Sequence, residues 1–460
     1  MDIQEILQKP FDKVLDELTV YSKGKDEKIA SNRQAYDGDH AILHDTARAP
    51  KLVGDTASNQ RLVKHTSEVI TMQERIVESA VTFLFGEPVS LVSNDESTTA
   101  IDAVNDVWKT NKLDYFNKAL ARDLFIECKV AELWHIPKGE TIRIRVSLLS
   151  KRTGYSFYPH FDEFGNMDAF TVRYTTKDAD GKEQQTVLIH TDAKIIDAYK
   201  PTSGNWIVTP RANPAGKILV VYYEQDKPEW KGVETEINRY EYLMSNHADT
   251  NDYNGSPLTM IKGEVDNMPR KEEMGKVVYV KAETDQNGQV SYPGGVSFVS
   301  WDQSPESIKL EMDNLKDIIY SMTQTPDLSF GNVKGMNAVS GIALRLMFSD
   351  ALFKARNKQE IFGPGLERRL SIIKSILALT DVNNKAEYLN SDIDVVFNDV
   401  LPQDLESLIR SLSLARGGEA IMSEESAIKA NPLVTDAERD IEILSEEKTA
   451  LKSFAESYSA

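Results

Sequence analysis

Six residues near the N-terminus are the first that could do chemistry. Asp37-Gly38-Asp39-His40 is followed by His44-Asp45, so two histidines stand four residues apart beside three carboxylates. Imidazole and carboxylate groups bind divalent metals, and this spacing would bring both histidines to one face of a helix. Gly38 and the polar surroundings instead indicate a loop. We therefore predict a structural loop with hydrogen-bonding histidines and keep a metal site as the weaker alternative.

The other usual carriers of catalysis are missing from the sequence. It has no Gly-x-x-x-x-Gly-Lys-Ser/Thr phosphate loop, no Gly-x-Ser-x-Gly elbow, no Cys-x-x-Cys and no His-Glu-x-x-His. The first absence leaves no case for an ATP-driven motor. A single cysteine, Cys128, excludes an intrachain disulfide framework and fits a reducing compartment during synthesis. No cofactor, metal or catalytic residue is predicted.

The charge balance limits how the protein can meet nucleic acid. The chain carries 53 Lys and Arg against 72 Asp and Glu, a formal net charge of −19. Tight phosphate binding needs a cationic surface, so a protein that grips DNA is disfavoured. The charge is uneven: residues 381–460 hold 17 acidic and 7 basic side chains, whereas residues 342–380 hold 7 basic and 3 acidic. We expect the basic stretch either to pair with the acidic tail or to form a solvated face.

Periodicity predicts an α+β protein with an antiparallel sheet. Apolar residues at helical spacing predict helices at residues 1–30, 61–85, 98–128, 234–253, 304–323 and 342–379, and in the acidic tail from residue 404. Alternation predicts strands at residues 141–149, 170–175, 186–190, 194–199, 217–223 and 393–398, and a hairpin around Asn287-Gly288. The longest apolar runs are too short to span a bilayer, and residues 1–5 do not resemble a signal peptide.

The helix predicted at residues 304–323 carries a narrow apolar seam. Its members repeat at alternating spacings of four and three: Ile308, Met312, Leu315, Ile319 and Met322. Such a seam packs beside another helix, either within the chain or in a neighbouring subunit. The helix would be about 30 Å long.

Two glycine-rich segments follow this helix. Residues 326–341 have three glycines and no regular period, which predicts an ordered loop between helices. Lys334 is its only cation, and Asn332 and Asn337 could reach phosphates. Further on, Gly363-Pro364-Gly365 falls inside the helix predicted at residues 342–379, where proline removes a hydrogen bond, so we expect an interruption and a sharp kink.

Several segments, in order, resemble portal proteins of tailed double-stranded-DNA bacteriophages and prophages. The first are Ala35-Tyr36-Asp37-Gly38-Asp39-His40-Ala41-Ile42-Leu43 and the run from Arg75-Ile76-Val77-Glu78 to Phe83-Leu84-Phe85-Gly86-Glu87-Pro88-Val89. In the centre, a helix, a small β segment, a second helix and a loop ending in Ala338-Val339-Ser340-Gly341-Ile342-Ala343-Leu344 are similar to the family's stem, clip, stem and tunnel loop. The run 418–447 resembles its closing segment.

The resemblance implies a division of the chain into named regions. These are a wing at 1–233, a first stem helix at 234–262, a clip at 263–303, a second stem helix at 304–325, a tunnel loop at 326–341, a kinked helix and strand of the wing at 342–402, and an acidic helical crown at 403–460. The tunnel-loop residues Asn332, Lys334 and Asn337 would then face DNA, and the seam would pack between subunits.

The resemblance also implies a function and its partners. A ring of about twelve copies would stand at one capsid vertex and pass double-stranded DNA without sequence preference. The ring would meet the terminase large subunit, a head-completion or adaptor protein, and the major capsid and scaffolding proteins. It would assemble in the host cytoplasm, become part of the virion, use no cofactor and touch no membrane.

Two other functions remain open at this stage. One is a different head-completion or capsid-associated protein, which would lack a ring with an axial channel. The other is a metal-dependent nuclease with Asp37–Asp45 as its metal site, whose cleavage of plasmid DNA would be abolished by Asp39→Ala.

Overall fold

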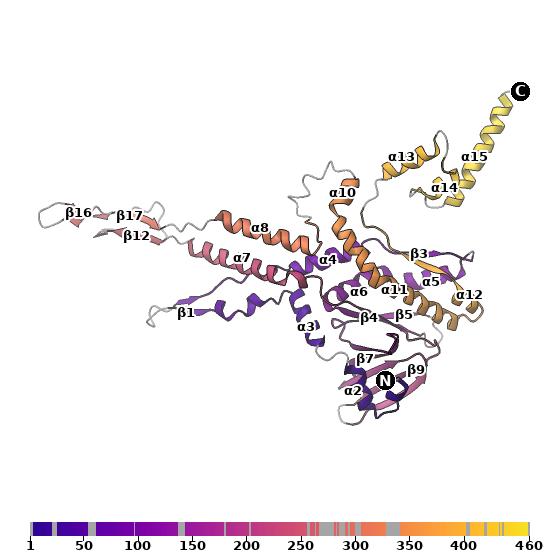
Figure 1. Ribbon diagram of the computed structural model, residues 1–460, viewed down its shortest axis with the longest axis horizontal. Coiled ribbons are helices and arrows are strands. Elements are labelled where there is room, and N and C mark those ends of the chain that lie inside the picture. Colours follow the sequence, from indigo (N-terminus) through magenta and orange to yellow (C-terminus); the bar gives the residue numbers. More distant parts are fainter. Residues whose placement is uncertain are drawn as a thin grey trace.

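The computed structural model shows a body of helices and antiparallel sheets from which three projections extend (Figure 1). The longest is a pair of helices tipped by β strands, the second is an arm of two short strands, and the third holds the C-terminal helices. The structure describes residues 3–20, 25–53, 61–95, 97–136, 143–178, 181–201, 204–254, 258–262, 264–265, 280–281, 283–284, 290–292, 295–299, 305–327, 341–401, 405–417, 421–431, 433–434 and 437–458.

Helices and two small sheets form the centre of the body. The helices are α4 (Met72–Phe85), α5 (Thr99–Thr110), α6 (Leu113–Glu127), α11 (Ser349–Thr380) and α12 (Lys385–Asn390). A three-stranded sheet has the order β11 (Val220–Glu224), β4 (Lys129–His135), β5 (Arg145–Leu149), and β3 (Ser90–Ser93) pairs with β18 (Ile393–Val396). Phe125 and Phe362 are fully buried in the core that these elements share.

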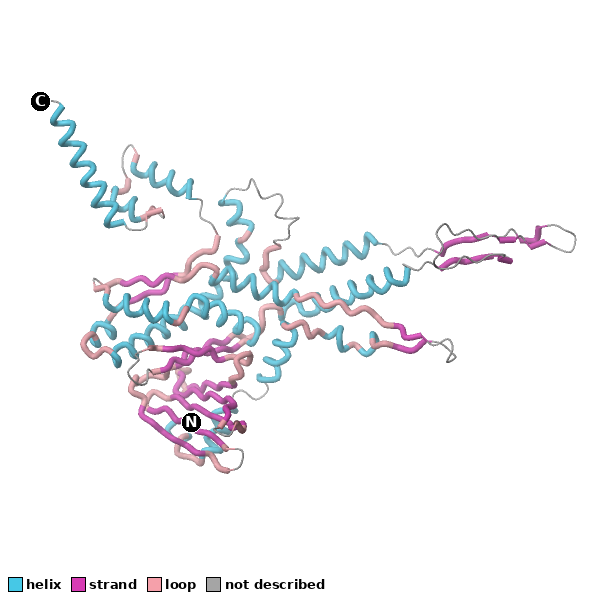
Figure 2. Tube along the Cα trace, turned by 180° about the vertical axis from the view of Figure 1, so that it is seen from behind, coloured by secondary structure: helices cyan, strands magenta, loops and turns pink. Residues whose placement is uncertain are grey.

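A five-stranded antiparallel sheet lies beside this centre (Figure 2). Its order is β10 (Ile207–Ala212), β9 (Lys194–Lys200), β8 (Glu183–His190), β7 (Met167–Lys177), β6 (Ser156–Phe161). The N-terminal helices α1 (Ile3–Ile6) and α2 (Phe11–Thr19) cover one face, where Leu18 packs with Val187 and Ala198. The predicted mixture of helices with antiparallel sheet is confirmed.

The helix predicted at residues 61–85 is wrong over its first eleven residues. The structure places β2 (Arg61–Val63) opposite β1 (Lys51–Val53), and α4 begins only at Met72. Three alternate backbone N–H groups between them, at residues 66, 68 and 70, donate to side chains of α7 (Glu234–Asn254) at 2.6–2.9 Å. These bonds to another element hold residues 64–71 in an extended conformation instead of a helix.

Two further predictions need correction. The helix expected at residues 98–128 divides at Lys112, whose φ of 51° is left-handed, into α5 and α6. The 1–30 helix is likewise three helices, α1, α2 and α3 (Lys25–Tyr36). Strand β4 was not predicted at all, because six of its seven residues are buried and its sequence therefore lacks the alternation of a half-exposed strand.

The two helices of the longest projection begin and end within one residue of their predicted bounds. Helices α7 and α8 (Pro305–Met322) lie side by side and connect the body to a strand pair, β12 (Leu258–Lys262) with β17 (Gly295–Val299) (Figures 1 and 2). Shorter pairs are β13 (Glu264–Val265) with β14 (Val280–Lys281), and β15 (Glu283–Thr284) with β16 (Val290–Tyr292). The last pair flanks the predicted Asn287-Gly288 turn, which lies outside the described residues.

The helix predicted at residues 342–379 breaks at a different place from the one expected. A turn at Phe348 separates α10 (Gly341–Met347) from α11, whereas α11 runs through Gly363-Pro364-Gly365 without interruption. Gly363 has no Cβ to collide with the following proline ring, which lets the helix continue there. The predicted interruption is therefore wrong, and a kink in the axis stays a prediction.

The C-terminal projection is helical, as the sequence predicts. It consists of α13 (Leu405–Arg416), α14 (Glu424–Lys429) and α15 (Ala437–Tyr458). The Ser423 hydroxyl caps α14 by accepting a bond from the backbone N–H of Ser426.

Candidate functional site

Side chains of the Asp37–Asp45 cluster make hydrogen bonds to other parts of the chain. His40 is buried, and its ring nitrogens lie 2.5 Å from Glu241 Oε1 and 2.7 Å from the carbonyl of Ala35. His44 pairs instead with Asp39 on the exposed surface. Asp45 caps a short 3-10 helix, η3 (Thr46–Arg48), and accepts a bond from Tyr242 of α7. Within the described part of the chain, no group of three His, Cys, Asp or Glu side chains is placed to hold a metal.

These bonds fasten the segment before β1 to α7. The guanidinium of Arg48 adds to them, donating to Asn246 at 2.5 Å and to Asp249 at 2.7 Å. Hydrogen bonding to Glu241 also raises the pKa of His40, against the opposing effect of burial. The conspicuous polar cluster of the sequence therefore positions the long helical projection on the body.

The described residues that lead into the predicted 326–341 loop are held by ion pairs. Asp327 accepts an ion pair from Lys316 of α8 at 2.7 Å and one from Arg75 of α4 at 3.4 Å. The same two cations lie over the ring of Tyr320. The predicted DNA-facing residues Asn332, Lys334 and Asn337 lie outside the described residues, so their role stays a prediction.

A buried network of ion pairs holds the chain just after the end of α8, four residues before Asp327. The ammonium of Lys354 donates to Glu229 at 2.8 Å and to the carbonyl of Thr323, one residue after α8 ends, at 2.9 Å. Lys358 lies 2.5 Å from the other oxygen of Glu229. Burial would raise the pKa of Glu229, but the two lysines hold it below its usual value. The end of α8 is thereby tied to α11 and to the segment after β11.

Four of the five seam residues of α8 are turned away from solvent. Ile319 is fully buried in the main core, and Ile308, Met312 and Leu315 are half-buried, on a helix that packs along α7. Met322 is the exception, with 69% of its surface exposed. Leu310 and Ile318 are also exposed, at 62% and 45%. The structure thus leaves three apolar side chains of α8 exposed, of which Met322 belongs to the predicted seam and Leu310 lies on nearly the opposite side of the helix.

The basic residues of 342–380 bind the body of the protein. Arg369 is fully buried and donates to Glu132 and Asn117 at 2.7 Å, and the Tyr223 hydroxyl donates to the same Glu132 at 2.6 Å. Arg345 faces Asp399 at 3.6 Å. The pairing with the acidic helical tail that the sequence left open is not observed for these described side chains. Their partners lie on β4, on helix α6 and in the segment after β18.

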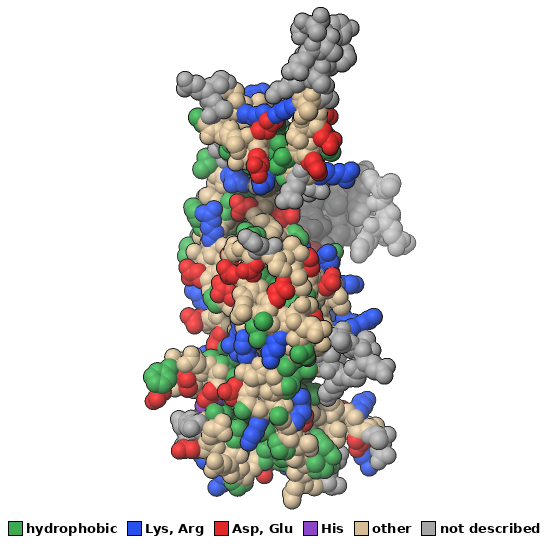
Figure 3. Space-filling view, turned by 90° about the vertical axis from the view of Figure 1, so that its right-hand side faces the viewer, with side chains coloured by type: hydrophobic (Ala, Val, Ile, Leu, Met, Phe, Trp, Pro, Cys, Tyr) green, Lys and Arg blue, Asp and Glu red, His purple; other side chains and the backbone are tan. Residues whose placement is uncertain are grey.

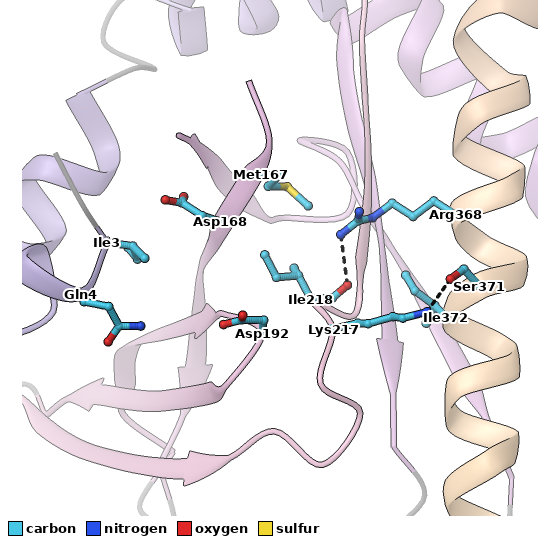
Figure 4. A pocket seen from close by; sticks show the side chains of 10 residues that line it. All are labelled: Ile3, Gln4, Met167, Asp168, Asp192, Lys217, Ile218, Arg368, Ser371 and Ile372. Atoms are coloured by element: carbon cyan, nitrogen blue, oxygen red, sulfur yellow. Dashed lines mark hydrogen bonds between the residues drawn. The ribbon is translucent and has the colours of Figure 1, made fainter. Parts of the chain in front are cut away.

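Arg368 of α11 and Lys217, which precedes β11, line a cavity of about 500 Å³ between α1 and α11 (Figure 4). Arg368 donates to the carbonyls of Val220 and Ile218, and Lys217 donates to the hydroxyl of Ser371 at 2.7 Å. Burial and the nearby cations Lys374 and Arg368 lower the pKa of Lys217. The cations therefore hold the three-stranded sheet against α11.

Two further features of the chain bear on function, its single cysteine and the hydropathy of its helices. Burial raises the pKa of the Cys128 thiol to about 12, so it is not a reactive thiolate at neutral pH. Among the described residues, no helix is long and apolar enough to cross a bilayer.

Known proteins resemble this chain over most of its length. Residues 23–453 match the family described as phage portal protein, SPP1 Gp6-like. The chain is 22% identical over 421 residues to the portal protein of Bacillus phage SPP1, covering 87% of this chain and 78% of that protein.

Two solved structures are also similar, at low identity. They are the neck of a native GTA particle computed with C12 symmetry and the neck of an empty GTA particle computed with C6 symmetry. The TM-score is 0.40 for both, with 11% and 12% identity; they cover 78% and 77% of this chain, and the match spans 88% and 87% of theirs. The match over residues 23–453 settles the family: the chain belongs to the SPP1 Gp6-like phage portal proteins.

Proposed function

We propose that about twelve copies of this chain form a ring at one vertex of a phage capsid. The ring is the channel through which double-stranded DNA enters during packaging and leaves during ejection. The observation that carries this proposal is the family match over residues 23–453, and no catalytic role is proposed. The projection suits a channel wall, because the antiparallel helices α7 and α8 extend side by side from the body (Figure 1).

The proposed regions follow the described elements. Helices α7 and α8 form the stem, the strands β12 to β17 the clip, and α13 to α15 the crown. The sheets and the helices around α11 form the wing. In the ring, the exposed side chains of Leu310, Ile318 and Met322 on α8, with the predicted seam, pack against neighbouring stems. Apolar side chains of this size gain stability when a neighbour removes them from water.

DNA contact is assigned to residues 326–341, with Asn332, Lys334 and Asn337 facing the duplex. The anchor at Asp327 supports this assignment, because it fixes the start of the loop between the stem and the body. Acidic and basic side chains are interspersed over the face shown in Figure 3. A mixed surface on an acidic chain holds DNA weakly, and weak contact suits DNA that must slide.

The partners follow from the same assignment. The terminase large subunit docks during packaging, and a head-completion or adaptor protein binds afterwards. The wing meets the major capsid and scaffolding proteins. The ring assembles in the host cytoplasm and remains in the virion.

Native mass spectrometry of the purified chain, with negative-stain microscopy, tests the ring. We expect a closed ring of about twelve copies with an axial channel; a neighbouring number also supports the proposal. A monomer or dimer under all conditions would overturn it.

The loop assignment has its own test. Lys334→Glu should leave ring formation intact and reduce packaged DNA, because the charge reversal repels phosphate in the channel. Lys177→Glu, an exposed change of the same type at the end of β7, is the control and should leave packaging unchanged. If Lys334→Glu prevents ring formation, or packages DNA as well as the control, the assignment is wrong.

A further inference from the structure

A second cavity lies between the two wing sheets, away from the proposed channel loop. Its volume is about 590 Å³, and its lining includes Arg143, Arg145, Arg211, His135 and His190. Arg145 and His135 belong to the three-stranded sheet, whereas Arg211 and His190 belong to the five-stranded one. No acidic side chain is among the described residues that line it.

His190 is the unusual member of this lining. It is only 4% exposed, and neither ring nitrogen has a hydrogen-bond partner in the chain. Buried polar groups are almost always hydrogen-bonded, and one left without a partner destabilises the fold. Both ring nitrogens have almost no accessible surface, so His190 lies in the wall behind the arginines and its nitrogens do not reach the cavity.

The arginines identify the chemistry of that partner. Arg211 has one ionic partner, Asp197 at 2.9 Å, and Arg145 makes one long bond, of 3.4 Å, to the carbonyl of Thr110. Arg143 is exposed at the edge of the cavity. Guanidinium groups carry five donors each, so most of these donors remain for a ligand. Three guanidinium groups lining one cavity favour an oxyanion with several acceptor oxygens.

We propose that this cavity binds a phosphate group, free or on a mononucleotide, held by Arg143, Arg145 and Arg211. Phosphate fits better than carboxylate because it offers more oxygens to donors that come from two sheets. The volume and the apolar wall that includes Trp134 leave space for a body attached to the phosphate. The site joins the two sheets of the wing and is independent of the proposed channel.

Isothermal titration calorimetry of the full chain at low salt tests the site with inorganic phosphate and with deoxyadenosine 5′-monophosphate. We expect saturable binding of at least one probe. Tighter binding of the nucleotide identifies a nucleotide site, and equal affinities identify a site for the phosphate group alone. Arg143→Gln and Arg145→Gln should each weaken binding tenfold or more.

The control is Arg173→Gln, which removes a half-buried arginine of β7 that does not line the cavity. It should change the affinity less than twofold. The proposal is overturned if neither probe binds, or if Arg143→Gln binds as tightly as the unaltered chain. Arg143 is exposed, so its substitution tests the site without disturbing the core. Ring formation is measured separately, so failure here leaves the channel proposal standing.

Discussion

Two buried histidines show how a side chain's surroundings set its charge. His40 has Glu241 beside it, and its pKa is raised. His190 has no partner, and burial, together with the charge of Arg211, lowers its pKa to about 4, while Asp197 opposes and His135 adds slightly to the effect. Protonation therefore stabilises the fold at the first position and destabilises it at the second.

The pH dependence of His190 can be measured. Its pKa is about 4 in the folded chain and near 6.5 in the unfolded chain, so between these values the unfolded chain binds more protons. The free energy of unfolding should consequently fall by about 3 kcal/mol from this group as the pH drops from 6.5 to 4. Thermal unfolding in phosphate-free buffer measures it.

His190→Phe is the matched variant for that measurement. It removes the titrating group and keeps a ring of similar size, so the unfolding midpoint should fall less steeply between pH 6.5 and 4. An identical pH profile in the variant would show that His190 does not titrate in this way.

At this scale the sequence predicts only part of what the structure shows. The Asp37–Asp45 cluster stands out in the sequence, and the prediction of hydrogen-bonding histidines agrees with the bonds of His40. Glu241, which binds His40, is 201 residues away and carries no signal of its own. The cavity around His190 could not be found either, because its lining joins strands from two sheets whose meeting is set by tertiary packing.

At the scale of elements, α11 shows why two neighbouring residues of one motif have opposite effects. A Cβ on Gly365 would lie 2.1 Å from the ring of Tyr223, so the glycine lets that strand residue pack against the helix. Pro364 is exposed and only removes a backbone hydrogen bond. The motif looks like a helix break in the sequence, but one of its residues serves packing.

Substitutions at these two positions should shift stability in opposite directions. Gly365→Ala should lower the free energy of unfolding by about 1–3 kcal/mol, because the Tyr223 ring must move away from Glu132. Pro364→Ala should raise it by up to about 3 kcal/mol, because it restores a helical hydrogen bond. Denaturant titration of both variants compares them directly. A loss of stability in Pro364→Ala would show that the proline itself is needed.

Elements were predicted well where they obey a single period and poorly where tertiary contacts decide. Helices α7 and α8 follow from the helical spacing of their apolar residues. The extended run before α4 does not, because its backbone donors are satisfied by Asp249, Ser245 and Glu241 on α7. These bonds outweigh local helix preference, and no periodicity announces them.

At the scale of the whole molecule, the exposed apolar side chains Leu310 and Met322 of α8 provide a test of ring assembly. Leu310→Glu with Met322→Glu should leave the helical content of the chain unchanged, since both side chains already face water. The same pair should reduce ring formation, because charges would be buried between neighbouring stems. Circular dichroism and native mass spectrometry measure the two effects.

Lys309→Glu serves as the control, since it changes an exposed charge on the same helix. Rings should form normally from it. Rings that form equally well from the Leu310–Met322 double variant would show that these side chains face solvent in the assembly. The order of segments along the chain predicted the family, but the packing of α8 on α7 was needed to show which apolar residues of α8 stay exposed.

The network around Lys354 has a mechanical consequence. Its ammonium connects the end of α8 to α11 and to the segment after β11, at the point where the 326–341 loop begins. Pulling these elements apart would strand a buried charge, at a cost of about 3–5 kcal/mol. A force that pulls on the end of α8 is therefore transmitted directly to α11. The base of the α7–α8 projection is thus a stiff joint of the molecule.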